Sequence, residues 1–423
     1  MTKDEVRAAR LLRWTTRAEA GAGVALALAA AWGGALALRT GGHWTEGVLG
    51  RTGVALGLGG LLFLGVGRLL RPGVAAQQVR WARRRLALLA GAALALSPVL
   101  AAEVAARVLP APAGGPRIEQ GTSEEMFEHD PLLGYRPRHP MQVRAWKTAD
   151  GAPIYEATYT IDAHGRRVVP ASAAPGGAGP LVLFLGCSNT FGEGVDDDQT
   201  MAHHLALRAG RRAEVVNLGF CGYGPQQFLA RLERGDLDDL VAGREVVAIY
   251  PFIDAHVNRA IGSLGIVTAW GADMPCYELE AGEPRLQGTL RGARPVRSWA
   301  YALLSRSQAA RQRGLELPRL RDAHYALVAG IVDAAARRLA ARAARVTFHV
   351  AFLPGVTRGE RLSAHLAGTA ARVLDYSKLL PDDPRWRFDH DFHLTPAAHA
   401  ALGARLHDDT LGADAPMAIV GPR

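Results

Sequence analysis

Residues 181–194 read LVLFLGCSNTFGEG, and this stretch decides the fold class. Its first five residues are apolar and run directly into Gly186, as expected for a buried strand that ends at a turn. Similar apolar runs follow at 215–218, 246–250 and 346–352. Segments with helical periodicity separate these runs, at 201–209, 226–232 and 323–343. Alternating strands and helices predict a three-layer α/β sandwich, a parallel sheet with helices on both faces.

The carboxyl ends of the strands are where ligands bind in sheets of this kind. The first strand leads into Ser188 and Asn189, and the second into a glycine-rich turn that contains Gly222. The third leads into Asp254, His256 and Asn258, which are candidates for lining a pocket or for a structural polar network. Near the C-terminus, 389–396 read DHDFHLTP and precede a helix that Thr395 caps and Pro396 begins.

This set of residues predicts acyl-transfer chemistry. A serine hydroxyl is a weak nucleophile until an imidazole accepts its proton, and a carboxylate orients that imidazole. We expect Ser188 to be the nucleophile, with the base and the orienting acid supplied by the Asp/His cluster at 389–393. The backbone N–H groups of Ser188 and Gly222 are the expected oxyanion donors. The motif around Ser188 is G-x-S-x-T, which lacks the second glycine of the α/β-hydrolase elbow.

Three blocks of the sequence, in this order and spacing, resemble those of SGNH (GDSL-type) hydrolases and acyltransferases. The first is 183–195, the second is 217–224 with Gly222 at the oxyanion glycine, and the third begins at Asp391-x-His393. Segments 130–137 and 159–162 resemble those that precede this domain in bacterial membrane-bound members. The resemblance covers 181–410 most closely. It implies a flavodoxin-like sandwich, ester hydrolysis or acyl transfer at Ser188, and no cofactor.

The chain departs from the family pattern after the first and third strands. Cys187 replaces the aspartate that usually precedes the serine. Ile253 stands where the family has an asparagine that donates to the oxyanion, and Asp254 follows it. Loss of one such donor lowers the rate by about 10²–10³ in a well-studied protease. Asn258 is a candidate substitute, and two backbone donors are the other solution.

The acid, the nucleophile and the state of the cysteines each have a second candidate assignment. The resemblance makes His393 the general base. His390 occupies the usual position of the acid, three residues before His393. Some family members place the acid two residues before the histidine, so Asp391 is the first choice for the orienting acid and Asp389 the reserve. Cys187 is a weaker candidate for the nucleophile. Cys187 and Cys221 both follow strands, and their pairing in a disulfide depends on geometry. The acidic run 196–198 with His203 and His204 is attributed to a helix N-terminus, and no metal site is expected.

The net charge of +9 lies entirely in the first quarter of the chain. Residues 1–109 hold 14 Lys/Arg and five Asp/Glu, whereas 110–423 hold 35 of each sign. Nucleic-acid binding needs a basic face that displaces counterions, so the larger part of the chain is not expected to bind nucleic acid.

Three apolar stretches at 20–38, 52–67 and 86–102 predict transmembrane helices. The preceding tail carries five basic residues, the first loop two and the second loop six. Because positive loops stay in the cytoplasm, this pattern predicts a multi-pass inner-membrane protein with a periplasmic C-terminal domain. A cleaved signal peptide and a soluble helical bundle are the alternatives.

Together these inferences predict three regions: a membrane domain (1–109), a linker with accessory β structure (110–180) and an SGNH-like domain (181–415). The predicted function is a membrane-anchored serine esterase acting on an acylated cell-envelope glycan or lipid. The alternatives are an O-acyltransferase, a soluble cytoplasmic esterase, and a catalytically weak domain that binds glycan or scaffolds an envelope assembly.

Overall fold

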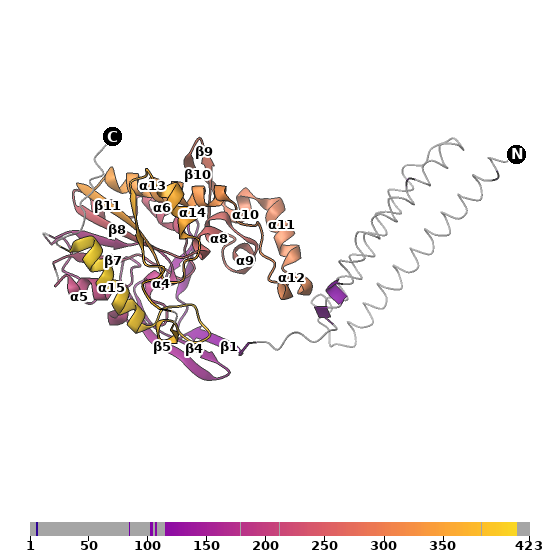
Figure 1. Ribbon diagram of the computed structural model, residues 1–423, viewed down its shortest axis with the longest axis horizontal. Coiled ribbons are helices and arrows are strands. Elements are labelled where there is room, and N and C mark those ends of the chain that lie inside the picture. Colours follow the sequence, from indigo (N-terminus) through magenta and orange to yellow (C-terminus); the bar gives the residue numbers. More distant parts are fainter. Residues whose placement is uncertain are drawn as a thin grey trace. The chain divides into compact units, whose positions relative to one another are not determined.

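A computed structural model describes residues 115–177, 179–210, 212–381 and 383–412, together with Val6, Arg84, 102–104, 106 and 107. The chain forms two compact units, Met1–Val108 and Leu109–Arg423. Nearly all described residues belong to the second unit, whose strands and helices are labelled in Figure 1.

A five-stranded parallel sheet forms the centre of the second unit, with the order β12-β11-β8-β6-β7. Its strands are β6 (Leu181–Phe184), β7 (Glu214–Asn217), β8 (Glu245–Phe252), β11 (Arg345–Phe352) and β12 (Ala371–Asp375). Counted along the chain, this order is 2-1-3-4-5, that of flavodoxin-like folds. The predicted parallel α/β sheet is confirmed. The first four strands lie within two residues of their predicted bounds, whereas β12 was not predicted.

Helices cover both faces of this sheet (Figure 1). The first face carries α6 (Pro225–Arg234), α8 (Ala255–Ile261), α13 (Asp322–Ala340) and α14 (Gly359–Leu366). The second carries α5 (Met201–Arg208) and α15 (Pro396–Leu411). Side chains alternate along a strand, so Leu181 and Leu183 enter the first core while Val182 and Phe184 enter the second. β6 is therefore apolar at every position, as is typical of a central parallel strand.

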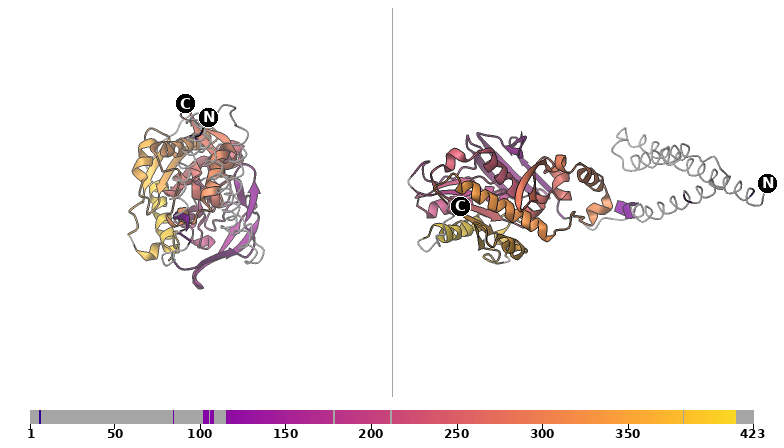
Figure 2. Two further views of the ribbon diagram at one scale, coloured as in Figure 1. Left: turned by 90° about the vertical axis from the view of Figure 1, so that its right-hand side faces the viewer. Right: turned by 90° about the horizontal axis from the view of Figure 1, so that it is seen from above.

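An accessory antiparallel sheet precedes β6 and lies along one flank of the domain, in purple in Figure 2. It consists of β1 (Ile118–Thr122), β4 (Met141–Ala149) and β5 (Ala152–Ile161), next to a hairpin of β2 (Phe127–Asp130) and β3 (Gly134–Pro137). Arg167 joins it to the parallel sheet, because its backbone bridges Ile161 on β5 and Asn217 on β7. The buried Arg167 side chain pairs with Asp197. The accessory sheet thus joins the parallel sheet at β7, next to β6.

A third, smaller core lies in the insertion between α8 and α13. The insertion contains α9 (Leu264–Ala269), β9 (Pro275–Glu280), β10 (Glu283–Thr289), α10 (Leu290–Ala293), α11 (Pro295–Leu304) and α12 (Gln308–Gln312). The remaining elements are α4 (Ser188–Phe191), α7 (Asp238–Val241), η1 (Asp197–Gln199) and η2 (Pro384–Trp386). The insertion holds Trp270, which reaches the turn at Gly222.

The structure contradicts the prediction of three transmembrane helices. In the part of the chain that it describes, no helix is both long enough and apolar enough to cross a membrane. The longest of these helices, α13, has 19 residues and includes Asp322, Asp333, Arg337 and Arg338. The stretches 20–38, 52–67 and 86–102 lie outside the described residues, apart from residue 102 at the end of the third. The same finding contradicts the predicted multi-pass topology and inner-membrane location.

Candidate active site

Ser188 lies where the central strand β6 gives way to a short helix. β6 ends at Phe184, Cys187 is the N-cap residue, and Ser188 is the first residue of α4. The helix ends after one turn, because Gly192 adopts a left-handed conformation with φ of 89° and donates its N–H to the Ser188 carbonyl. This turn holds the buried Ser188 at the carboxyl edge of the sheet, where the sequence predicts the site.

His393 and Asp391 lie in line with Ser188. The Ser188 Oγ is 2.8 Å from His393 Nε2, and His393 Nδ1 is 2.7 Å from Asp391 Oδ1. An ionised carboxylate only accepts hydrogen bonds, so Nδ1 carries a proton that it donates to Asp391, and Nε2 is left to accept the serine proton. Ser188, His393 and Asp391 are thus joined by the two hydrogen bonds that nucleophilic serine chemistry requires.

Asp391 rather than Asp389 is the carboxylate that reaches the imidazole. Its Oδ1 also accepts the backbone N–H of His393, at 3.1 Å, and its Oδ2 lies 3.0 Å from Lys147 Nζ. Burial alone would raise the pKa of the Asp391 carboxyl, but the hydrogen bonds from His393 and the ion pair with Lys147 hold it well below its usual value. Asp389 is exposed. Asp391 therefore stays ionised beside the imidazole across the neutral range.

Arg387 positions the loop that carries these two residues. Its guanidinium donates to the carbonyl of Pro354, just beyond β11, and to the carbonyl of Phe392, next to His393. Downstream, the Thr395 hydroxyl accepts the Ala398 N–H and so caps α15, as predicted. The loop is thus held at both ends.

The expected oxyanion donors lie on two adjacent turns. Within the part of the chain that the structure describes, the N–H groups of Ser188 and Gly222 have no hydrogen-bond acceptor. The turn at Gly222 is held from outside, by Tyr135 Oη donating to the Cys221 carbonyl and by Trp270 Nε1 donating to the Gly222 carbonyl. Both N–H groups are therefore free to donate to an oxyanion.

Replacement of Gly222 by Ala is expected to lower kcat/KM about 100-fold, the effect of losing one oxyanion donor. Gly222 has a φ of 77°, and an added Cβ would lie 2.4 Å from Tyr135 Oη and 2.7 Å from Trp270 Nε1, so the turn must move. Gly282→Ala is the matched control. Gly282 has a similar φ of 86°, but a Cβ added to it would meet no atom within 4 Å. Steady-state kinetics that are equal for the two variants would contradict this role.

The residues after β8 do not join the array formed by Ser188, His393 and Asp391. His256 is fully buried, stacks on Tyr250 and shares a hydrogen bond of 2.7 Å with its hydroxyl, and burial lowers the pKa of His256 well below its usual value. Asp254 accepts two hydrogen bonds from Thr357. Ile253 packs against the second core, and its side chain has no hydrogen-bond donor. Asn258 lies on α8, and among the described residues no hydrogen bond joins it to Ser188 or His393.

Asn189 lies next to Ser188 on α4 and is also buried. Its Oδ1 has no hydrogen-bond partner among the described atoms.

The three cysteines are free thiols, so Cys187 and Cys221 form no disulfide. The acidic run ties β5 to the domain, because Asp196 and Asp197 accept the backbone N–H groups of Thr158 and Thr160.

Two charged residues that the sequence analysis did not single out lie against the array. Lys147 on β4 contacts Asp391, and Glu193 places Oε2 3.4 Å from His393 Nε2. Tyr155, which faces Lys147 across the β4–β5 pair, donates to Glu193 Oε1 at 3.3 Å. The one available signal was composition, since Lys147 is one of only three lysines in a chain with 46 arginines.

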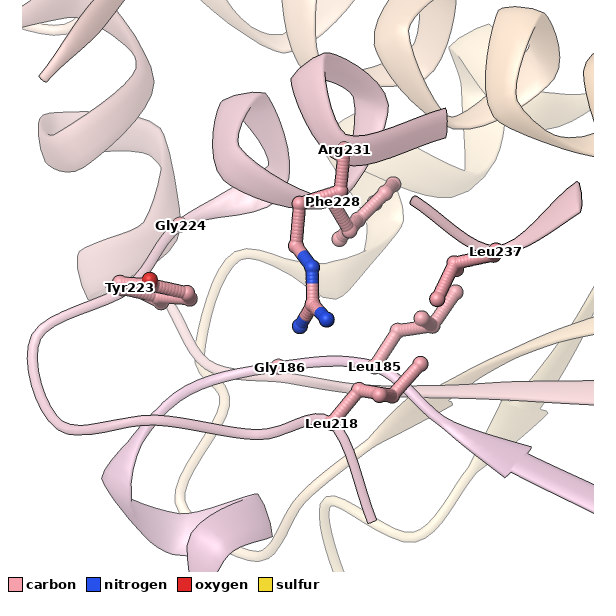
Figure 3. Close-up of a pocket in the computed structure, with 8 residues that line it drawn as sticks. All are labelled: Leu185, Gly186, Leu218, Tyr223, Gly224, Phe228, Arg231 and Leu237. Carbon is pink, nitrogen blue, oxygen red and sulfur yellow. The ribbon is translucent and has the colours of Figure 1, made fainter. Parts of the chain in front are cut away.

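Two hollows differ sharply in their fit to a ligand. The first, with a volume of about 10 Å³, lies between α6 and the ends of β6 and β7, and the side chain of Arg231 points into it (Figure 3). It holds one water at most. The second, of about 580 Å³, lies between the tip of the β4–β5 hairpin and the loop before Asp391, and Ile154, Arg385, Phe388 and His390 are among its lining residues. Only the second has the size of a ligand site.

Comparison with known proteins supplies no relative from which an activity can be transferred. No protein-family model matches the chain, and no curated protein matches it.

Proposed function

We propose that the protein is a serine esterase or acyl hydrolase of the SGNH type. Ser188 is the nucleophile, His393 the general base and Asp391 the acid that orients it. The observation that carries the proposal is the continuous array from Ser188 Oγ to His393 Nε2, at 2.8 Å, and from His393 Nδ1 to Asp391 Oδ1, at 2.7 Å. Ser188 is distant in sequence from the other two, and the three side chains adopt this geometry at the carboxyl edge of the sheet.

The proposed reaction proceeds in two stages. Ser188 Oγ attacks the ester carbonyl while its proton passes to His393 Nε2, and Asp391 stabilises the resulting imidazolium. The N–H groups of Ser188 and Gly222 stabilise the oxyanion of the tetrahedral intermediate. His393 then returns the proton to the departing alkoxide oxygen, leaving an acyl group on Ser188. Water activated by His393 releases the acid and restores the serine.

An ester-linked acyl group on a glycan or a lipid is the proposed substrate class. The resemblance to SGNH proteins supports this class. The groove of about 580 Å³ lies beside the loop that carries Asp391 and has polar and apolar lining residues, among them Arg385, Phe388 and Ile154, but Ser188 and His393 do not line it. Transfer to a glycan hydroxyl instead of water is the acyltransferase form of the same chemistry. The two forms differ only in the nucleophile that attacks the acyl-serine.

A second candidate function is a catalytically weak domain that binds an acylated glycan. Ile253 favours it, because this apolar side chain packs against the second core at the position where the SGNH family has an oxyanion donor. Under this alternative the array around Ser188 remains, but the two backbone donors at Ser188 and Gly222 stabilise the oxyanion too weakly for turnover.

Reaction with a fluorophosphonate probe separates the two candidates, since the probe modifies a serine only when a base activates it. We expect the full-length wild-type protein to be labelled at neutral pH and Ser188→Ala not to be labelled, as read by in-gel fluorescence. Equal, poor labelling of both proteins would reject the esterase and favour the binding domain.

A further inference from the structure

The accessory sheet places Lys147 against the acid end of the array. Lys147 lies on β4 and is almost fully buried, and its Nζ is 3.0 Å from Asp391 Oδ2. The Asp391 side chain has no exposed surface, so both carboxylate oxygens need partners inside the protein. His393 satisfies Oδ1 and Lys147 lies at Oδ2. A buried carboxylate held from both sides has one orientation toward the imidazole.

Glu193 lies at the opposite end, beside the nitrogen that accepts the serine proton. It follows α4 closely, and its backbone N–H donates to the Ser188 carbonyl. Its Oε2 is 3.4 Å from His393 Nε2, while Tyr155 Oη donates to its Oε1. Tyr155 faces Lys147 in the β4–β5 register, so one cross-strand pair of the accessory sheet reaches both ends of the array.

We infer that Lys147 and Glu193 are positioning residues that act on His393 in opposite directions, so that the accessory sheet is part of the active site. This inference rests on the proposed esterase function. Lys147 holds Asp391 in place and favours the neutral imidazole that accepts the serine proton. Glu193 stabilises the imidazolium after the proton has moved from Ser188 to Nε2, until the leaving oxygen takes it.

The opposite effects of Lys147 and Glu193 follow from the charges that surround His393. Asp391 and Glu193 are the negative groups in contact with it, and Lys147 is the positive group next to Asp391. Arg387 faces Asp391 from the same loop. His399 on α15 interacts electrostatically with His393 and with Arg167, and burial lowers the pKa of His399 to about 3, so it is neutral at working pH. Without the negative charge of Glu193, the positive charges of Lys147 and Arg387 disfavour the imidazolium form of His393. Without the positive charge of Lys147, the negative charges of Asp391 and Glu193 favour the imidazolium form.

The test is the pH dependence of kcat/KM for a short-chain acyl ester, measured on the full-length protein. The acidic limb of this profile reports protonation of the general base. Glu193→Gln keeps an acceptor for Tyr155 but removes the charge, so the midpoint of the acidic limb is expected to fall by about one pH unit. Lys147→Met is expected to raise that midpoint by about half a unit to one unit and to lower kcat about tenfold.

Charge-neutralising controls at exposed positions are Glu124→Gln and Lys378→Met, and neither is expected to move the midpoint. Lys147→Arg keeps the positive charge and is expected to retain the wild-type midpoint. This rescue distinguishes positioning by charge from a purely structural role, and it keeps the test informative if Lys147→Met unfolds. Thermal melting of each variant reports whether it is folded.

The outcomes separate the inference from the function on which it rests. Opposite shifts for Glu193→Gln and Lys147→Met, with the Arg rescue, support it. Unchanged midpoints, or shifts in the same direction, in an active enzyme would overturn it while leaving the esterase intact. A wild-type protein that reacts with neither ester nor fluorophosphonate would overturn the proposed function, and this inference with it.

Discussion

Replacement of His393 by Ala is expected to lower kcat for ester hydrolysis by about 10⁴- to 10⁶-fold, with little change in KM. The Ser188 hydroxyl is buried, and its one hydrogen bond in the array is to His393 Nε2, at 2.8 Å. Without the imidazole no group in the array is left to accept the proton of Oγ. The backbone N–H groups of Ser188 and Gly222 remain, so a residual rate above that of the solvent reaction is expected.

Because the proton of Ser188 passes to His393, the two residues are expected to show a non-additive effect when both are replaced. Ser188 and His393 act as one unit, so Ser188→Ala combined with His393→Ala is expected to be no slower than either single variant. His164→Ala is the matched control, because His164 is exposed in a turn after β5. Steady-state kinetics that show multiplicative losses in the double variant would contradict the array.

Replacement of Asp391 by Asn is expected to lower kcat by about 10⁴-fold, as in the well-studied serine protease triad. The amide can present its NH₂ group to His393 Nδ1, which favours the tautomer with the proton on Nε2, where it blocks acceptance of the serine proton. Here the effect has a second source, since Lys147 loses the buried carboxylate that it faces at 3.0 Å.

Asp389→Asn is the matched control for this prediction. Asp389 is exposed and lines the groove, so its replacement is expected to leave kcat within a few-fold of the wild type and to act, if at all, on KM. A loss of kcat at Asp389 that equals or exceeds the loss at Asp391 would reverse the assignment of the acid.

The parallel sheet was predictable because its strands are apolar on both faces. β6 and β8 contain continuous apolar runs, whereas polar residues interrupt the runs of β7 and β11. The helices α5, α6 and α13 lie between these strands at the predicted places. β12 was missed because its partly exposed sequence, ARVLD, lacks such a run. The transmembrane prediction rested on hydropathy and loop charge, and no described helix supports it.

The site was predictable only where a residue directly follows a strand or belongs to a block. Ser188, Asp391 and His393 were chosen in this way, and the structure brings them together. Asp254 and His256 also follow a strand, but they bond to Thr357 and Tyr250 instead. Which way each side chain points from a short helix depends on tertiary packing.

Lys147 and Glu193 show what local patterns leave out. Lys147 lies in β4 and reaches Asp391, 244 residues later, only because the accessory sheet folds against the loop after β12. Glu193 is in the first block, yet its contact with His393 depends on the turn that ends α4 at Gly192. Both contacts depend on long-range pairing, which no short motif encodes.

The most direct test of the central claim is to trap the acyl-enzyme. The full-length protein is mixed with an activated acyl ester, quenched in acid within milliseconds to seconds, and analysed by intact mass and peptide mapping. The Ser–His–Asp array predicts a mass gain of one acyl group that maps to Ser188 and is absent from Ser188→Ala. An acyl group on Cys187, or no adduct while the ester is hydrolysed, would contradict Ser188 as the nucleophile.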